Sequence, residues 1–157
     1  MPHIITKIIA DDRRFELPDG AGSDAVHSDP QYGYAVTRLI TEDKNQSGTG
    51  IAYTLGGGTH LVQSAIELLS KPLVGQEIEA LMSDFGKAQR AMAEHHQIRW
   101  LGPHKGVTHL ALASITNACF DLWAKARGVP LWKLLLDLSP EALARLIDFS
   151  YLDEVLT

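Results

Sequence analysis

The sequence contains a single cysteine, Cys119, among its 157 residues. One cysteine cannot form an internal disulfide bond, and it cannot supply the several thiolates of a metal cluster. Cys119 lies among apolar residues at helical spacing, which is typical of a buried thiol that acts only as a small hydrophobic group. We therefore expect neither a disulfide scaffold nor thiol chemistry.

Long hydrophobic runs and an excess of basic residues are also missing. No stretch approaches the roughly 20 apolar residues that a membrane-spanning helix needs, and the first residues do not follow the pattern of a secretory signal. Lys and Arg number 14 against 19 Asp and Glu, a formal net charge of -5, whereas binding to nucleic acid requires a basic surface. We therefore expect a cytoplasmic protein that binds neither membrane nor nucleic acid.

Motifs for catalysis and metal binding are absent as well. The seven histidines have no spacing that would gather three ligands around one metal ion, and Asp148 has no visible acidic partner. No Ser/His/Asp or Cys/His arrangement is recognisable. The run Gly56-Gly57-Gly58-Thr59 lacks the spacing of nucleotide-binding loops, so a turn from sheet to helix is favoured over a phosphate site. We predict no catalytic residue and no metal ligand in this chain.

The first third of the chain has the character of strands. β-Branched and apolar residues predict strands over residues 4–15, 34–40 and 49–55, of which the last two are joined by a polar turn. These strands would form a three-stranded antiparallel meander. The connection that begins at Leu17 and continues through Pro30 is rich in Gly, Pro and small polar residues, and loops of this length are more often functional than merely connective.

The rest of the chain is mainly helical. Apolar spacing predicts helices over residues 61–69, with Thr59 as N-cap, 78–95, 107–127 and 131–135. Gly128 is placed to end the third of these helices, and Ser139-Pro140-Glu141 is typical of the start of another. The segment Leu146–Tyr151 then predicts one more strand, which has no neighbour left in the sequence.

The long first loop is the best candidate for a binding site. Gly22, Ser23 and Asp24 offer backbone N–H groups, a hydroxyl and a carboxylate, and Tyr32 adds a ring with a polar tip. Such groups suit a ligand with many hydroxyls. From composition alone, however, a loop that is simply solvated is favoured over a binding loop.

Several segments resemble the enolase superfamily, and within it the L-fuconate dehydratases. The most specific is Arg99-Trp100-Leu101-Gly102-Pro103-His104-Lys105-Gly106-Val107; the others are residues 22–32, 54–59, 117–125 and 147–152. The resemblance spans nearly the whole chain. It departs from the family pattern at His104, where the family has an acid, at Ser150, where the family has Arg, and in a shorter loop before Gly22.

The resemblance implies a fold and a division into domains. Residues 1–139 would form the N-terminal capping domain, an α+β unit with a meander followed by a helical bundle. Residues 140–157 would begin a TIM-type barrel whose remainder is absent from this chain. In the family, the first loop closes over the mouth of the barrel, so Gly22, Ser23, Asp24 and Tyr32 would contact the substrate.

The resemblance also implies a reaction. The family removes the proton next to a carboxylate and then eliminates water, which gives a 2-keto-3-deoxy sugar acid, with Mg²⁺ and the catalytic base held by the barrel. This chain would then be a capping and specificity domain that is inactive alone and that binds an acid sugar together with the barrel. The alternatives are a stand-alone binding module that self-associates through its exposed apolar face, and an unrelated α+β domain.

Overall fold

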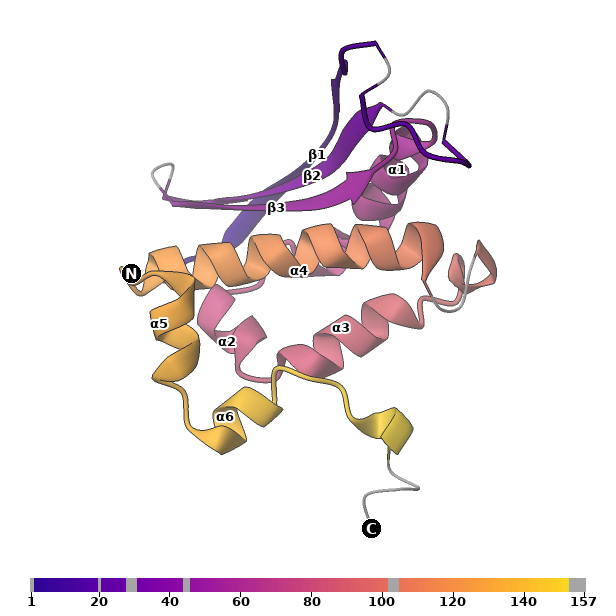
Figure 1. The fold of residues 1–157 in the computed structure, drawn as a ribbon. Coiled ribbons are helices and arrows are strands. Elements are labelled where there is room, and N and C mark those ends of the chain that lie inside the picture. Colours follow the sequence, from indigo (N-terminus) through magenta and orange to yellow (C-terminus); the bar gives the residue numbers. More distant parts are fainter. Residues whose placement is uncertain (1, 20, 28–30, 44–45, 102–104, 153–157) are drawn as a thin grey trace.

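The computed structural model describes residues 2–19, 21–27, 31–43, 46–101 and 105–152. A sheet lies above a layer of helices (Figure 1). Its strands are β1 (Ile5–Phe15), β2 (Tyr32–Thr41) and β3 (Ser47–Thr54), which pair antiparallel in the order β1-β2-β3. The predicted α+β class and the three-stranded meander are confirmed, with strand limits that differ only slightly from those expected.

The helices follow the sheet along the chain. They are α1 (Thr59–Leu69), α2 (Ile78–Met82), α3 (Phe85–Ala93), α4 (Gly106–Ala126), α5 (Leu131–Leu136) and α6 (Pro140–Ala144), with the 3-10 turns η1 (Lys71–Leu73), η2 (Arg99–Leu101) and η3 (Ser150–Leu152). After α4, Gly128 has a φ of 66°, as expected for the residue that ends a helix. Ser139 caps α6 by accepting a hydrogen bond from the Ala142 N–H. Across the described ranges, no helix is long and apolar enough to cross a membrane.

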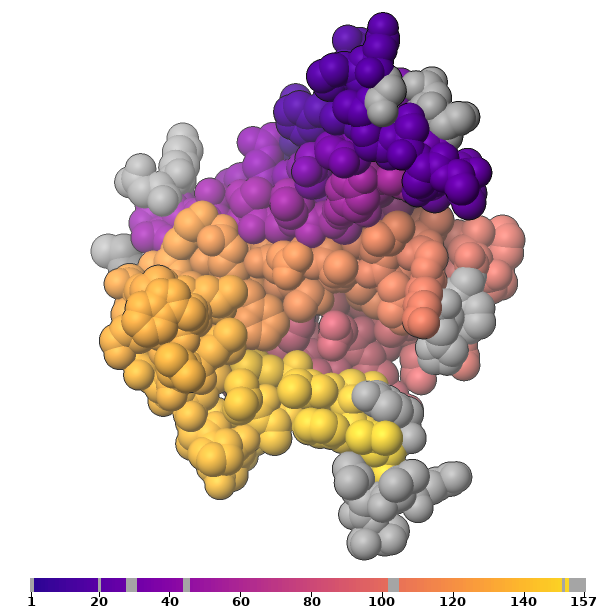
Figure 2. Space-filling view, viewed as in Figure 1, coloured from indigo at the N-terminus to yellow at the C-terminus, as the bar shows by residue number. Residues whose placement is uncertain are grey.

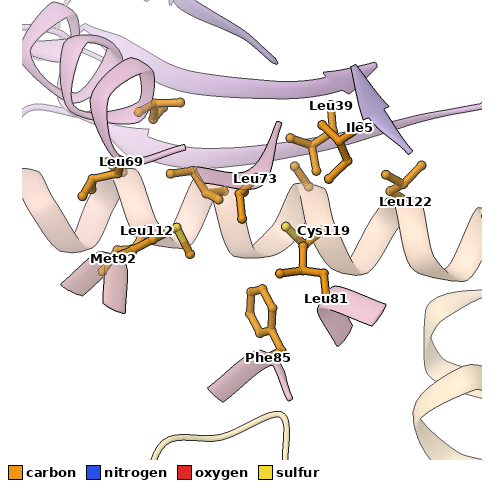
Figure 3. Packing of buried hydrophobic residues seen from close by; sticks show 14 of the residues in the cluster. Ile5, Leu39, Leu69, Leu73, Leu81, Phe85, Met92, Leu112, Cys119 and Leu122 are labelled. Carbon is orange, nitrogen blue, oxygen red and sulfur yellow. The ribbon is translucent and has the colours of Figure 1, made fainter. Parts of the chain in front are cut away.

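Helix α4 forms the centre of the hydrophobic core (Figure 3). One side of it faces the sheet, and the other side faces α2 and α3. Its fully buried residues are Ala111, Ser114, Ile115, Ala118, Cys119 and Leu122. Burial raises the pKa of the Cys119 thiol to about 12, so the expectation of an inert core cysteine is confirmed.

Small residues allow α4 to approach the sheet closely. A side chain at Gly50 would collide with the backbone of Ser114 and Ala118, and one at Gly48 would collide with the Ala118 carbonyl. The Ser114 hydroxyl donates to the carbonyls of Ala35 and Gly50, at 3.1 Å in each case. This contact joins α4 to both β2 and β3, and it satisfies a hydroxyl that is completely buried.

Two helix predictions need correction. Thr59 is not an N-cap: Gly58, with a φ of 85°, takes that position, while the buried Thr59 hydroxyl donates to the Gly56 carbonyl. The helix expected over residues 78–95 is two helices, α2 and α3, because Asp84 leaves the helical conformation. Ser83 and Asp84 are residues that favour helix ends over helix interiors.

The strand expected over Leu146–Tyr151 is also not formed. Residues 146–149 are irregular, and Ser150 begins η3. The segment lies against α3 instead, where the Gly86 N–H donates to the Arg145 carbonyl and a side chain at Gly86 would collide with Ile147. A strand needs a neighbouring strand to pair its backbone groups, and none of the three described strands lies beside this segment.

Candidate functional site

The candidate site is at one end of the sheet, where β1 ends, β2 begins and β3 ends. Phe15 and Tyr32 form the last pair of the β1–β2 ladder, and Gly33 pairs with Thr54 on β3. The loop between β1 and β2 leaves the sheet here and stands above the body of the molecule (Figure 2). Two connections therefore meet at this end: the long loop after β1, and the glycine-rich turn at residues 55–58 after β3.

Asp24 organises the described part of the long loop. Its Oδ1 accepts hydrogen bonds from the N–H groups of Val26 (2.8 Å) and His27 (2.7 Å), and the Asp24 N–H donates to the His27 carbonyl. The His27 Nδ1 lies 3.0 Å from the other carboxylate oxygen, Oδ2. The hydrogen bonds from the His27 backbone, the His27 ring and the Val26 backbone, in that order of size, lower the pKa of Asp24 to about 2. Asp24 is thus a fixed anion at neutral pH.

Of the other predicted loop residues, Gly22 and Ser23 lie on the surface next to Asp24 in the chain. Gly22 has a φ of 72°, a left-handed conformation that favours glycine. Gly22, Ser23 and Asp24 are all exposed residues. Tyr32 stands apart from these three, at the start of β2, and its ring packs on Tyr53.

A chain of aromatic rings covers the outer face of this end of the sheet. Tyr53 lies edge-to-face against Tyr32, with ring centroids 5.5 Å apart, and against Tyr34 at 5.9 Å. Tyr34 in turn contacts Phe15 at 5.7 Å. Partial burial and the neighbouring tyrosines raise the pKa of Tyr53, so its hydroxyl stays protonated at neutral pH.

The inner face of the same end is tightly packed around hydroxyl groups. The hydroxyls of Thr54 and Thr59 lie 2.7 Å apart, and a side chain at Gly33 would collide with both. A side chain at Gly56 would meet Gln31, the residue that precedes Tyr32. The turn at residues 55–58 therefore supports the end of the long loop, which agrees with the interpretation of Gly56-Gly57-Gly58 as a turn from sheet to helix.

A hollow lies between α3, α4 and the segment after α6. It has a volume of about 500 Å³. Arg90 lies on its wall between two carboxylates: its Nε is 3.4 Å from Glu94, and its Nη1 is 3.7 Å from Asp148. Asp148 also accepts a hydrogen bond from the Ser150 N–H, and hydrogen bonding to the side chain of Ser150, together with this backbone bond, lowers the pKa of Asp148. The acids of this hollow are engaged with Arg90 and backbone, and they do not form a metal site.

Metal binding finds no support among the residues that the structure describes. Nowhere in these ranges do three or more His, Cys, Asp or Glu side chains gather as metal ligands would. His104, where the family pattern has an acid, lies outside the described residues. The described donor atoms therefore do not fit Mg²⁺.

The sequence predictions missed His27 and Tyr53. Val26 and His27 follow Asp24 by two and three residues, within the reach of an aspartate side chain that accepts hydrogen bonds from the backbone N–H groups after it in a turn. Tyr53 alternates in phase with Ile51 on the outer face of β3, directly opposite Tyr34. Both signals were present, but they depend on pairing and turn geometry that only the structure reveals.

Comparison with known proteins relates the chain to longer enzymes. It is 41% identical over 155 residues to human mitochondrial enolase superfamily member 1, covering 98% of this chain and 35% of that protein. It is 40% identical over 154 residues to L-galactonate dehydratase from Hypocrea jecorina, with 98% and 34% covered. A scan against models of protein families found no match.

The comparison of structures agrees. The crystal structure of human mitochondrial enolase superfamily member 1 matches with a TM-score of 0.91 and 40% sequence identity, over 99% of this chain and 36% of that one. The chain thus spans about a third of the length of the curated relatives that it matches. Over nearly its whole length this chain is similar in sequence and in fold to enolase superfamily member 1, and its fold is that of the N-terminal capping domain of such proteins.

Proposed function

We propose that this chain is the capping and specificity domain of an acid-sugar dehydratase. The observation that carries the proposal is the loop at the end of the sheet, where an exposed, ionised Asp24 is held by its own turn. This loop stands on a scaffold related to acid-sugar dehydratases over nearly the whole chain. Residues 1–139 form the cap, and residues 140–157 begin the barrel domain.

The site residues suit a sugar acid. The Asp24 carboxylate accepts hydrogen bonds from hydroxyl groups, the Ser23 hydroxyl donates and accepts, and the Tyr32 ring offers an apolar surface with a polar tip. A sugar acid presents the matching groups, namely several hydroxyls along a short carbon chain. Gly22 lets the backbone bend toward the ligand without a side chain in the way.

The proposed reaction is the loss of water from a sugar acid after removal of the proton next to its carboxylate. L-Fuconate is the substrate that the sequence resemblance favours, and L-galactonate is the one in the name of a relative. This chain would bind and orient the sugar and exclude water from it, as closing loops do. The base and the Mg²⁺ ligands are proposed to lie in the barrel, outside this chain, because the described residues do not fit the metal.

The experiment compares the chain alone with the chain plus a barrel. The purified chain is incubated with Mg²⁺ and either L-fuconate or L-galactonate, and the 2-keto product is measured. We expect no product from the chain alone. Product should form when the barrel part of the human relative is added. Robust turnover by the chain alone would overturn the proposal that the chemistry lies elsewhere.

A second candidate is a stand-alone module that self-associates. Two large apolar side chains on α5 favour it: Trp132 is 65% exposed and Leu136 is 77% exposed. Exposed apolar patches of this kind mark interaction surfaces. Size-exclusion chromatography with light scattering distinguishes the candidates, since a monomer at high concentration counts against self-association and a dimer supports it.

The place of action stays a prediction from the sequence, namely the cytoplasm. A fluorescent fusion of the chain, viewed in its native cells, would test it. Signal confined to an organelle would contradict this prediction without affecting the proposed chemistry.

A further inference from the structure

The two ends of the substrate loop are connected by aromatic rings. Phe15 is the last residue of β1 and Tyr32 is the first residue of β2, and they pair across the ladder. The rings of Phe15 and Tyr32 are joined only through other rings: the Phe15 ring contacts Tyr34, and the Tyr32 ring contacts Tyr53. The contact between Tyr34 and Tyr53 completes the chain. Tyr53 is therefore the ring that joins Tyr32 to the remainder of the cluster.

These rings are not required to fill the core. Helix α4 covers the opposite face of the sheet, and Tyr32, Tyr53 and Phe15 are 37%, 46% and 56% exposed. All three contacts have interplanar angles between 64° and 75°, the edge-to-face arrangement in which the ring edge meets the electron-rich face of its neighbour. Such contacts depend on direction, so they fix the orientation of a ring that is partly in solvent.

The backbone on which Tyr32 stands is fixed from the other side. Gly33 lies so close to the hydroxyls of Thr54 and Thr59 that it has no room for a side chain, and Gln31 packs on Gly56. The backbone at Tyr32 is thus held by the inner packing, and the Tyr32 ring is held by Tyr53. Together these contacts fix the orientation of the Tyr32 ring at the base of the loop.

We propose that Tyr53 is a positioning residue, which holds the Tyr32 ring edge-to-face and thereby fixes the end of the substrate loop. The effect of this positioning on catalysis rests on the proposed function, because the orientation of the Tyr32 ring matters to turnover only if Tyr32 contacts the sugar acid. Its consequence for the loop does not depend on that function. The two can therefore be tested separately.

The first test uses the chain itself. Tyr53→Thr removes the ring from β3, and Ile51→Thr is the matched control, because Ile51 lies on the same outer face with a similar exposure of 49%. NMR measures the amide exchange rates of Phe15 and Tyr32 and the chemical shifts of the Tyr32 ring. We expect Tyr53→Thr to speed exchange at both amides by about three- to tenfold, the range for losing aromatic pairs. Ile51→Thr should leave both rates within about twofold.

Two further variants keep the test decisive. Tyr53→Phe retains the ring and should retain the slow exchange, because the contact uses the ring edge and face. Tyr53→Leu keeps an apolar group at the position and should behave like Tyr53→Thr, which covers the case in which the threonine variant fails to fold. Equal exchange in Tyr53→Leu and wild type, or equal acceleration by Ile51→Thr, would overturn the proposal.

The second test uses the chain mixed with the barrel part of the human relative. Tyr53→Leu should raise KM for the sugar acid about three- to tenfold with a smaller change in kcat, and Tyr53→Phe should restore KM. A mixture without turnover would count against the proposed function, while the exchange result would still decide the role of Tyr53. Turnover with an unchanged KM in Tyr53→Leu would refute the catalytic consequence of that role.

Discussion

At the scale of single residues, the loop is shaped by a few directed contacts. The Asp24 carboxylate accepts hydrogen bonds from the N–H groups of its own turn, and it also remains ionised and exposed. His27 adds its ring to the same carboxylate. A group that is already fixed loses little further freedom when a ligand binds, which favours recognition.

The titration of Asp24 tests this arrangement. Its pKa is lowered from 3.8 to about 2, so the carboxylate stabilises the turn fully above its unfolded pKa, and this stabilisation is lost as the pH falls toward 2. NMR titration of the side-chain carboxyl should give a midpoint near the lowered value. A midpoint near 3.8 would show that the turn is not formed in solution.

Substitution of Asp24 separates shape from charge. Asp24→Asn keeps an oxygen that accepts the Val26 and His27 amides, so the amide chemical shifts of both residues should stay close to wild type. Asp24→Ala removes the acceptor, and both shifts should move toward random-coil values. Equal spectra for the two variants would contradict the assigned hydrogen bonds.

At the scale of elements, the packing of α4 on the sheet organises the molecule. Helix α4 contacts the sheet through β3 and β2, and it also contacts α1, α2 and α3. Glycines at positions 48 and 50 and small residues on α4 bring the two layers together.

Gly50→Ala measures the closeness of this packing. The new methyl group would meet the backbone of Ser114 and Ala118, and backbone cannot give way as a flexible side chain can. We expect a loss of about 3 kcal/mol in the free energy of unfolding. Gly57→Ala is the control, because nothing lies within 4 Å of that position, and it should change stability by less than about 0.5 kcal/mol. Urea unfolding followed by circular dichroism gives both values.

Glu79 joins α2 to the end of α4. It accepts two hydrogen bonds from Arg127, both 2.7 Å, and one from the Trp123 ring N–H at 2.9 Å. The bonds from Arg127 lower the pKa of Glu79, so this stabilisation is present above the unfolded pKa of 4.5 and is lost as the pH falls through the lower folded value.

Glu79→Ala should lower the free energy of unfolding by about 1 kcal/mol at pH 7, because the pair of Glu79 and Arg127 is partly exposed and screened by solvent. The cost should shrink at pH 3, which is below the unfolded pKa of 4.5, because the unfolded carboxylate then binds a proton more readily than the folded one. Glu94→Ala is the control: Glu94 is exposed and 3.4 Å from Arg90, and its loss should cost less than about 0.5 kcal/mol. Equal costs for Glu79→Ala at both pH values would contradict the proposed charge contact.

Sequence reasoning succeeded where the pattern was long and local. The spacing of Leu110 to Trp123 predicted α4, and the polar turn between two β-branched segments predicted the hairpin of β2 and β3. It missed the break at Asp84, although Ser83 and Asp84 favour helix ends. It also failed at Leu146–Tyr151, which has the composition of a strand but lies beside none of the described strands. In the site, Asp24 and Tyr32 could be proposed from chemistry and resemblance, whereas the contacts made by His27 and Tyr53 required coordinates.

At the scale of the whole molecule, this chain corresponds to about a third of its relatives. Its fold places the loop between β1 and β2 at one end of the sheet and the segment after α6 beyond the opposite layer of helices (Figure 1). We propose that the catalytic groups lie in a barrel outside this chain. Function, on this view, requires a second body of protein against which the loop can close.

One measurement tests the role of the cap most directly: the kinetics of a chimera in which this chain replaces the corresponding part of the human relative. We predict that the chimera converts a sugar acid to its 2-keto product. Ser23→Ala or Tyr32→Ala in the chimera should raise KM about tenfold, while the exposed control Ser64→Ala leaves KM unchanged. A folded chimera that turns over sugar acids with the same KM in all three variants would contradict the assignment of this loop to the substrate.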